Sequence, residues 1–327
     1  MTDAHVPVLA DEAIAALAIR SDGVYVDATF GRGGHASRIL AALSPQGRLV
    51  ALDRDPDAQR AALALDDPRF VFRRAWFSEM PAVLDDLDLP LVDGVLLDLG
   101  ISSPQVDVAA RGFSFRNDGP LDMRMDPARG ESAAQFIAHA SLRELTGVIR
   151  DYGEERYAPA VASAIVAART HAPIVTTRQL AAAIAQAIGT RTRGDWHQDP
   201  AARSFQALRI FVNRELEELE LVLPRACARL RAGGRLAVIS FHSLEDRIVK
   251  RFIGAHSKPW RGDPRLSRLS LSEAQLPTPP LAAAGRAVKP SDAECAANPR
   301  ARSAVLRAAE RTHALLPADF FDAGSGA

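Results

Sequence analysis

The feature that most constrains the fold of this chain is the segment 24–35, Val-Tyr-Val-Asp-Ala-Thr-Phe-Gly-Arg-Gly-Gly-His. Its apolar start ends at Asp27, three glycines follow, and a helical pattern begins at His35. This order predicts a strand, a tight turn and a helix, a unit in which the backbone approaches a ligand closely because no side chain blocks it. Similar glycine turns occur in α/β proteins without a ligand there, so the turn alone does not decide the function.

A second strand pattern, residues 47–53, ends in a carboxylate, Asp53. It lies about 20 residues beyond the glycines, the spacing at which an acid accepts hydrogen bonds from ribose hydroxyls. The glycines lack the G-x-G-x-x-G order of dinucleotide sites, and Asp27 precedes them. An acid at that point suits a ligand with positive charge and no phosphate. The sequence therefore predicts a nucleoside site and favours S-adenosylmethionine.

Strand and helix patterns alternate through the first hundred residues. Further strands are expected at 70–73 and 91–98, and the second of these is apolar on both faces, like a central parallel strand. Asp55 before Pro56 predicts a helix start. This alternation predicts an α/β fold with a right-handed, doubly wound parallel sheet.

The alternation stops after residue 104. The elements expected beyond it are helices at 132–150, 155–171 (alanine-rich), 177–188 (capped by Thr177) and 204–230, strands at 233–240 and 303–309, a capping box of Ser243 and Asp246, and a loop at 271–280. We therefore expect residues 1–104 and 204–327 to form one α/β domain. Residues 105–203 are expected to form an inserted helical domain for substrate recognition.

Composition excludes several classes of protein. Two cysteines, Cys227 and Cys295, are too few for a disulfide framework and have no metal-ligand spacing, so no metal is expected. No apolar run is long enough to span a bilayer and no signal-peptide pattern is present, which predicts a cytoplasmic protein without a membrane partner. Lys+Arg and Asp+Glu both total 40, but residues 250–311 hold 12 basic and 5 acidic residues, a net of +7. This region is either a polyanion-facing surface or a solvated one.

The segment 98–105, Asp-Leu-Gly-Ile-Ser-Ser-Pro-Gln, follows the expected central strand. Enzymes that methylate exocyclic amines often have a proline turn there, and Ser103-Pro104 is a partial match. The N4 lone pair of cytosine is delocalised into the ring, so acceptors for its N–H groups would favour a more nucleophilic nitrogen. Ser102, Ser103 and the carbonyls around Pro104 are candidates, with an ordinary tight turn as the alternative.

Other candidates have equally plain alternatives. His242, after a later strand, could contact substrate or accept a proton, although a single histidine is more often structural. Arg111, Phe113, Phe115 and Arg116 interleave cations with aromatic rings, which suits an unstacked base and its phosphates but also suits core packing. Lys250 and Arg251 could contact an RNA backbone or simply form a solvated helix face.

Seven motifs in order resemble one family. They are Asp27-Ala-Thr-Phe-Gly-Arg-Gly-Gly-His, Leu97-Asp-Leu-Gly-Ile-Ser-Ser-Pro-Gln, Arg111-Gly-Phe-Ser-Phe, Gly119-Pro-Leu-Asp-Met-Arg-Met-Asp, Gly153-Glu-Glu-Arg, Ile239-Ser-Phe-His-Ser-Leu-Glu-Asp-Arg and Asn298-Pro-Arg-Ala-Arg-Ser. Together they resemble the RsmH (MraW) family of bacterial small-subunit ribosomal RNA methyltransferases, over nearly the whole chain from His5 to Thr312.

The resemblance implies a class I S-adenosylmethionine-dependent methyltransferase fold with a helical insertion. It implies methyl transfer to N4 of a cytidine in the decoding centre of 16S rRNA, with the small ribosomal subunit as partner. Carried over by position, the cofactor contacts would be Gly33, Gly34, His35, Asp53, Phe77, Asp98 and Gln105. The turn ends in Ser-Pro-Gln and lacks the aromatic that usually stacks on the target base, so Phe113 or Phe115 is the hypothesis for that contact.

Three alternatives remain open at this point. A DNA amino-methyltransferase would share the cofactor site, and a non-catalytic RNA-binding assembly factor would keep the fold without methyl transfer. An NAD-dependent oxidoreductase is disfavoured because G-x-G-x-x-G is missing. The sequence also leaves open whether the protein forms a homodimer, whether it acts on free RNA or on the assembled subunit, and which group accepts the amino proton.

Overall fold

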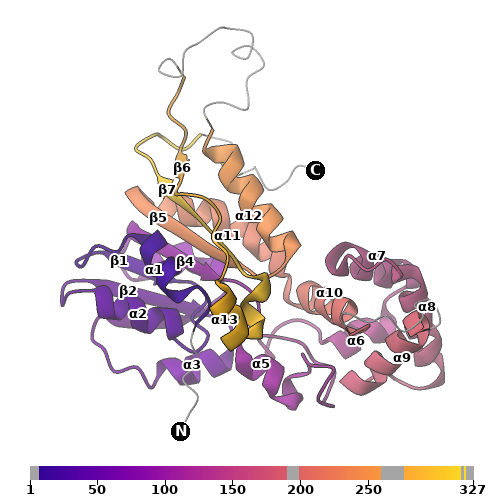
Figure 1. Ribbon diagram of the computed structural model, residues 1–327. Helices are drawn as coiled ribbons and strands as arrows, with labels where there is room; N and C mark the ends of the chain where they lie inside the picture. Colours follow the sequence, from indigo (N-terminus) through magenta and orange to yellow (C-terminus); the bar gives the residue numbers. More distant parts are fainter. Residues whose placement is uncertain (1–6, 190–198, 259–275, 318–319, 322–327) are drawn as a thin grey trace. The chain divides into compact units, whose positions relative to one another are not determined.

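The computed structural model describes residues 7–189, 199–258, 276–317 and 320–321 (Figure 1). The chain divides into two compact units, one of residues 1–100 with 216–327 and one of residues 101–215. We call them the sheet unit and the helical unit. The expected division at 104/105 and 203/204 differs from these limits, because residues 101–104 and 204–215 group with the helical unit.

The sheet unit is built on seven strands. They are β1 (Val24–Asp27), β2 (Arg48–Asp53), β3 (Phe70–Arg74), β4 (Val92–Asp98), β5 (Leu230–Ser240), β6 (Leu281–Ala283) and β7 (Val305–Arg311). Their order is β3-β2-β1-β4-β5-β7-β6, with β7 antiparallel to both neighbours and the other pairs parallel. This arrangement confirms the predicted class I methyltransferase fold. The strand order reverses between β1 and β4, the position at which open α/β sheets bind ligands.

Helices cover both faces of the sheet because side chains of successive strand residues point to opposite faces. On β4, Val95 and Leu97 join one buried core, and Leu96 joins the other. The first core takes residues from α4 (Met80–Asp86), α11 (Glu215–Arg229) and α12 (Ser243–His256), and the second takes residues from α1 (Ala10–Leu17), α2 (Gly34–Ala42) and α3 (Pro56–Ala62). Two short elements, α13 (Asp292–Ala297) and a 3-10 turn (Pro299–Ser303), precede β7.

The helical unit has a separate apolar core. Its helices are α5 (Ser103–Asp107), α6 (Ala133–His139), α7 (Leu142–Gly153), α8 (Ala158–His171), α9 (Thr177–Gly189) and α10 (Ala202–Asn213). Leu145 and Ile149 of α7, four residues apart, are both fully buried in this core. A Cβ on Gly153 would lie 2.7 Å from the carbonyl oxygen of Arg203, so glycine permits the close approach of α7 and α10.

The residues that cap the helices can be compared with the capping residues predicted from the sequence. The Asp55 carboxylate accepts a hydrogen bond from Asp57 N at 2.8 Å, so the predicted cap before Pro56 is confirmed. For α9, however, the capping hydroxyl belongs to Thr176, which accepts from Gln179 N at 3.3 Å. Thr177 is already the first helical residue, so the predicted cap is wrong by one position.

The cap of α12 is displaced in the same way. His242, not Ser243, is the residue before the helix, and its Nδ1 accepts from Glu245 N at 3.4 Å. Glu245 in turn accepts from Phe241 N at 2.8 Å. Asp246 forms a two-bond ion pair with Arg307 of β7 at 2.7 and 3.0 Å. The predicted box of Ser243 and Asp246 is therefore wrong, because Asp246 binds the sheet and the capping carboxylate is Glu245.

Two expected helices are each interrupted. The helix expected at 204–230 breaks at Arg214, whose φ of +50° ends α10 before α11 begins. The helix expected at 132–150 is divided at Ser141, whose hydroxyl accepts from Glu144 N and starts α7. The short edge strand β6 was not predicted, and of the expected loop at 271–280 only 276–280 lies within the described residues, without helix or strand. Within the described residues, no helix is both long and apolar enough to cross a membrane.

Candidate functional site

The glycine turn after β1 has the backbone geometry that glycine permits. Gly31 and Gly33 have φ of +54° and +78°, in the left-handed region that other residues rarely adopt. A Cβ on Gly33 would also lie 2.8 Å from the ring of Phe30. The bare backbone at the N-terminus of α2 is therefore required by the turn itself.

Asp53, at the carboxyl end of β2, holds this turn in place. One of its carboxylate oxygens accepts a hydrogen bond from Gly31 N at 2.8 Å, and the other accepts from Asp55 N at 2.8 Å. Burial raises the pKa of Asp53, while the two backbone hydrogen bonds lower it in part. The carboxylate is thus fixed in orientation beside the turn, as a ribose-binding acid would need to be.

A buried polar cluster lies at the carboxyl ends of β1 and β4. We define the proton cluster as Asp27, which ends β1, His35 in the first turn of α2, and Asp98, which ends β4. His35 Nε2 lies 3.3 Å from Asp98 Oδ2, and the side chains of Asp27 and His35 are 1% and 5% exposed. Asp27 Oδ2, Asp98 Oδ1 and both ring nitrogens of His35 are buried without a hydrogen-bond partner. Four such atoms in one place are unusual, because buried polar atoms are ordinarily hydrogen-bonded.

Burial shifts the protonation of this cluster. It raises the pKa of Asp27 to about 7, although the positive charge of His35 and a hydrogen bond from Thr29 N oppose the shift. Burial alone would lower the pKa of His35, but the close contact with the carboxylate of Asp98, together with the charge of Asp27, outweighs it and raises that pKa. Within the cluster, Asp27 therefore changes protonation near neutral pH.

Asp27→Asn should stabilise the ligand-free protein more at pH 8 than at pH 5. A folded-state pKa above the unfolded value means that folding favours the protonated acid, so the stability of the native protein falls as pH rises from about 4 to about 7. Asparagine is neutral throughout and keeps the acceptor for Thr29 N. We expect its advantage to grow by about 2 kcal/mol between pH 5 and pH 8 in urea unfolding.

Asp67→Asn provides the control for this prediction. Arg69 holds the pKa of Asp67 at about 2, so this carboxylate stays ionised over the whole interval and its loss should change stability equally at both pH values. If the difference between Asp27→Asn and the unmodified protein were the same at pH 5 and pH 8, the proposed protonation of Asp27 would be wrong.

Hydrogen bonds fix the ends of the neighbouring strands. Asp98 N donates to Thr29 Oγ1 at 2.6 Å, which joins the glycine turn to β4. Leu99 N donates to the Ile239 carbonyl of β5 at 2.9 Å. Phe77, which follows β3, begins a short 3-10 turn and is partly buried against the first core. Its predicted contact with the cofactor stays a prediction.

The segment around Ser103 belongs to the helical unit and begins α5. Ser102 N donates to Gln105 Oε1 at 3.0 Å, and Pro104 lies in the first turn of the helix. Gln105 is only 4% exposed, and both serines are half-buried. This geometry has the form of an ordinary helix start. The acceptor role of the two serines and the cofactor contact of Gln105 stay predictions.

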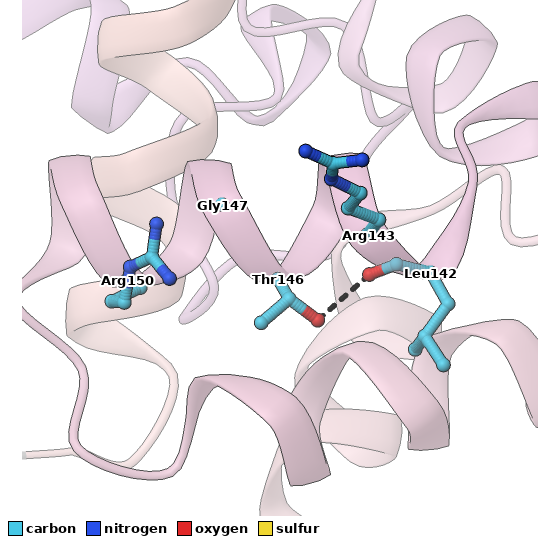
Figure 2. A pocket seen from close by; sticks show the side chains of 5 residues that line it. All are labelled: Leu142, Arg143, Thr146, Gly147 and Arg150. Atoms are coloured by element: carbon cyan, nitrogen blue, oxygen red, sulfur yellow. Dashed lines mark hydrogen bonds between the residues drawn. The ribbon is translucent and has the colours of Figure 1, made fainter.

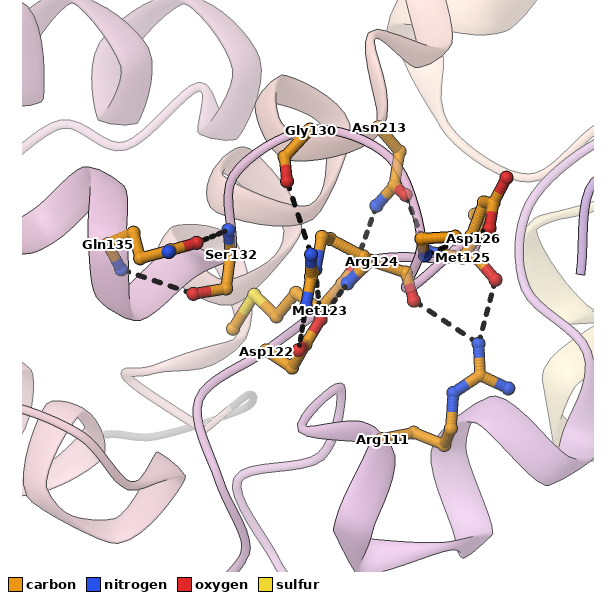
Figure 3. A network of polar contacts seen from close by, with 11 residues as sticks. Arg111, Asp122, Met123, Arg124, Met125, Asp126, Gly130, Ser132, Gln135 and Asn213 are labelled. Carbon is orange, nitrogen blue, oxygen red and sulfur yellow. Dashed lines mark hydrogen bonds and ion pairs between the residues drawn. The ribbon is translucent and has the colours of Figure 1, made fainter.

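The aromatic residues expected to stack on a base are largely inside the helical unit. Phe113 is 8% exposed, and the ring of Phe115 packs edge-on against Phe205 with centroids 5.4 Å apart. Arg111 donates to the carbonyls of Arg124 and Met125 at 3.2 and 3.0 Å (Figure 3). These contacts favour packing and loop anchoring over RNA contact, and base stacking by either ring stays untested.

A polar network around the loop 119–126 was missed by sequence reasoning. The buried Asn213 accepts from Met125 N at 2.7 Å and donates to the Met123 carbonyl at 2.7 Å (Figure 3). Arg124 forms a two-bond ion pair with Asp122 at 2.8 and 2.7 Å. The motif here is local, but its partner Asn213 is about 90 residues away, so no spacing rule could have connected them.

Asn213→Ala is expected to destabilise the helical unit by about 2–4 kcal/mol, because it removes the side-chain hydrogen bonds to the Met125 N–H and the Met123 carbonyl. Urea unfolding would measure the change. Asn117→Ala, at an exposed position of the same unit, is the control and should have little effect. Equal stabilities of the two variants would contradict the prediction.

The remaining candidates differ in their surroundings. His242 caps α12, and its Nε2 lies 3.1 Å from Glu245 Oε1, so the structural interpretation of this histidine is supported. Lys250 and Arg251 are exposed on α12. In the helical unit, α7 carries a pocket lined by Leu142, Arg143, Thr146, Gly147 and Arg150 (Figure 2). Arg150 is paired with Asp151 at 2.7 Å.

Comparison with known proteins identifies the family of this chain. The sequence profile described as the MraW methylase family matches residues 2–312. The chain belongs to the MraW methylase family. Membership confirms the predicted resemblance and the predicted cofactor, S-adenosylmethionine.

Relatives in this family cover almost the whole chain. A protein of Thiobacillus denitrificans is 61% identical over 95% of this chain and 98% of its own length. A protein of Azoarcus sp. is 60% identical over 94% and 96%, and one of Neisseria gonorrhoeae is 56% identical over 96% and 97%. All three are named ribosomal RNA small subunit methyltransferase H.

Proposed function

We propose that this protein transfers a methyl group from S-adenosylmethionine to N4 of a decoding-centre cytidine in the 16S rRNA of the small ribosomal subunit. The observation that carries the proposal is the identity of 56–61% to relatives named as small-subunit ribosomal RNA methyltransferases, over at least 94% of the chain. The choice of a cytidine N4 is the finer part of the proposal, and it comes from the family resemblance of the sequence motifs. Such a substrate accords with the expected cytoplasmic location.

The residues of the sheet unit fit the methyl donor. Asp27 Oδ2 and Asp98 Oδ1 are buried acceptors without donors, which suits an ammonium group. Gly33 and Gly34 would let the backbone approach the ligand, and the fixed carboxylate of Asp53 would accept from the ribose hydroxyls. Phe77 would form an apolar wall for adenine. When bound, the donor's sulfonium supplies an electrophilic methyl carbon.

The protein's own contribution is orientation and desolvation. An amino nitrogen conjugated with the cytosine ring is a weak nucleophile, so holding it in line with the methyl group and excluding water supplies most of the reduction of the barrier. Ser102, Ser103 and the carbonyls around Pro104 would accept from its N–H groups. Arg111, Phe113, Phe115, Lys250 and Arg251 remain candidates for RNA contact, of which Lys250 and Arg251 are exposed.

Incubation with labelled S-adenosylmethionine tests the proposal. The substrates are small subunits from a strain that lacks this methyltransferase, protein-free 16S rRNA and duplex DNA, each followed by nucleoside analysis. We expect label in N4-methylated cytidine of the rRNA or the subunit and none in DNA. Label in DNA would favour a DNA amino-methyltransferase, and cofactor binding without any transfer would favour a non-catalytic assembly factor.

A further inference from the structure

The proton cluster is unusual because its charges are not balanced by fixed partners. Among the described residues, no lysine or arginine forms an ion pair with Asp27 or Asp98, and the ion pair of Asp98 is with His35. The other charged groups that act on the cluster are Asp53 of β2 and Arg38 of α2. The buried Asp27 and His35 and the partly exposed Asp98 therefore share a site that can hold a proton in place of a cation.

An ammonium group and a proton would compete for this site. An ammonium has three donors and no acceptor, so it binds ionised carboxylate oxygens and not a carboxyl O–H. Asp27 Oδ2 and Asp98 Oδ1 are both buried and without donors, whereas Asp27 Oδ1 already accepts from Thr29 N. A proton on Asp27 would occupy the same lone pairs that the cation needs.

We propose that the proton cluster binds the ammonium group at the amino-acid end of the methyl donor and releases a proton to solvent as that group enters. The proposal rests on the proposed function for the identity of the ligand. No covalent bond changes in the process, because one O–H or N–H proton of the cluster passes to the buffer and the ligand ammonium takes its place.

The amount released depends on pH in a defined way. If Asp27, with its pKa of about 7 in the free protein, is fully ionised in the complex, binding releases about 0.9 proton at pH 6.0 and about 0.2 at pH 7.5. Affinity then rises roughly eightfold between these two values.

Isothermal titration calorimetry in phosphate and in imidazole buffer measures this release, because the two buffers take up protons with different enthalpies. S-adenosylhomocysteine is the probe with the ammonium group, and 5′-methylthioadenosine is the probe without it. We expect buffer-dependent heats for the first ligand and not for the second. Asp27→Asn should bind S-adenosylhomocysteine without buffer dependence and with nearly the same affinity at both pH values.

Asp53→Asn is the matched control. It should weaken the binding of both ligands but leave the difference in proton release between S-adenosylhomocysteine and 5′-methylthioadenosine unchanged. Equal heats in the two buffers for S-adenosylhomocysteine, or equal proton release by 5′-methylthioadenosine, would overturn the inference and leave the proposed function standing. Even if Asp27→Asn folds poorly, the comparison of the two ligands on the unmodified protein still shows whether binding of the ammonium group releases a proton. If neither ligand bound, the cofactor assignment would fail, and the inference would fail with it.

Discussion

Asp53→Ala is expected to weaken binding of S-adenosylmethionine about 100-fold. The carboxylate holds the backbone N–H groups of Gly31 and Asp55, so its loss loosens the glycine turn. It also removes the proposed acceptor for the ribose hydroxyls. Hydrogen bonds to a charged group contribute about 1.5–3 kcal/mol, and each 1.4 kcal/mol is about tenfold in affinity.

Calorimetry or equilibrium dialysis would measure this effect, and methyl transfer at a low donor concentration should fall in parallel. Asp67→Ala is the control, because Asp67 is also a carboxylate of the sheet unit but is paired with Arg69 at 2.7 Å, away from the glycine turn. Donor affinity within a few-fold of normal in Asp53→Ala would show that this carboxylate does not bind the cofactor.

Gly112→Ala is expected to destabilise the helical unit by more than about 3 kcal/mol. Gly112 has φ of +74°, and a Cβ there would lie 2.2 Å from the carbonyl oxygen of Pro120 and 2.6 Å from Asp122 N. Both neighbours are main-chain atoms of the loop 119–126 and cannot rotate away. The substitution must therefore displace the loop that Arg111 and Asn213 anchor.

Gly130→Ala isolates the steric part of this effect. Gly130 has φ of +70° in the same unit, but a Cβ there would meet no atom within 4 Å. It should cost only about 1–2 kcal/mol, the strain of a left-handed backbone conformation. Similar losses in urea unfolding for the two variants would mean that backbone conformation, and not the contact with Pro120, makes glycine necessary at 112.

Much of the sheet could be predicted because its signals are local. The apolar run 91–98 and the carboxylate ends at Asp27 and Asp53 depend only on neighbouring residues, and the strands formed where expected. Helix limits were less certain. At Thr177 and Ser243 the helix begins one residue earlier than predicted, because the sequence offers two capping residues in a row and tertiary contacts select one.

In the candidate site, too, features that depend on nearby residues could be predicted, and contacts between distant residues could not. The spacing from the glycines to Asp53 is a chain-local signal, and the structure places this acid against the turn. The contact between His35 and Asp98 joins residues far apart in the chain, and only the pairing of β1 with β4 brings them together. For Phe115 the local pattern was ambiguous, because an aromatic residue beside an arginine occurs both in protein cores and on RNA-binding surfaces. In the structure its ring packs against Phe205.

The place of β7 in the sheet has a consequence for biosynthesis. This strand is made after β5 and β6 but lies between them, with Arg235–Ser240 of β5 aligned to Val305–Glu310. At 5–20 residues per second, a ribosome needs roughly 3–13 s to translate from the end of β5 at Ser240 to the start of β7 at Val305. Throughout that interval the outer edge of β5 has no native partner. A nascent chain at this stage presents an open, apolar strand edge, which is the surface that chaperones must shield from aggregation.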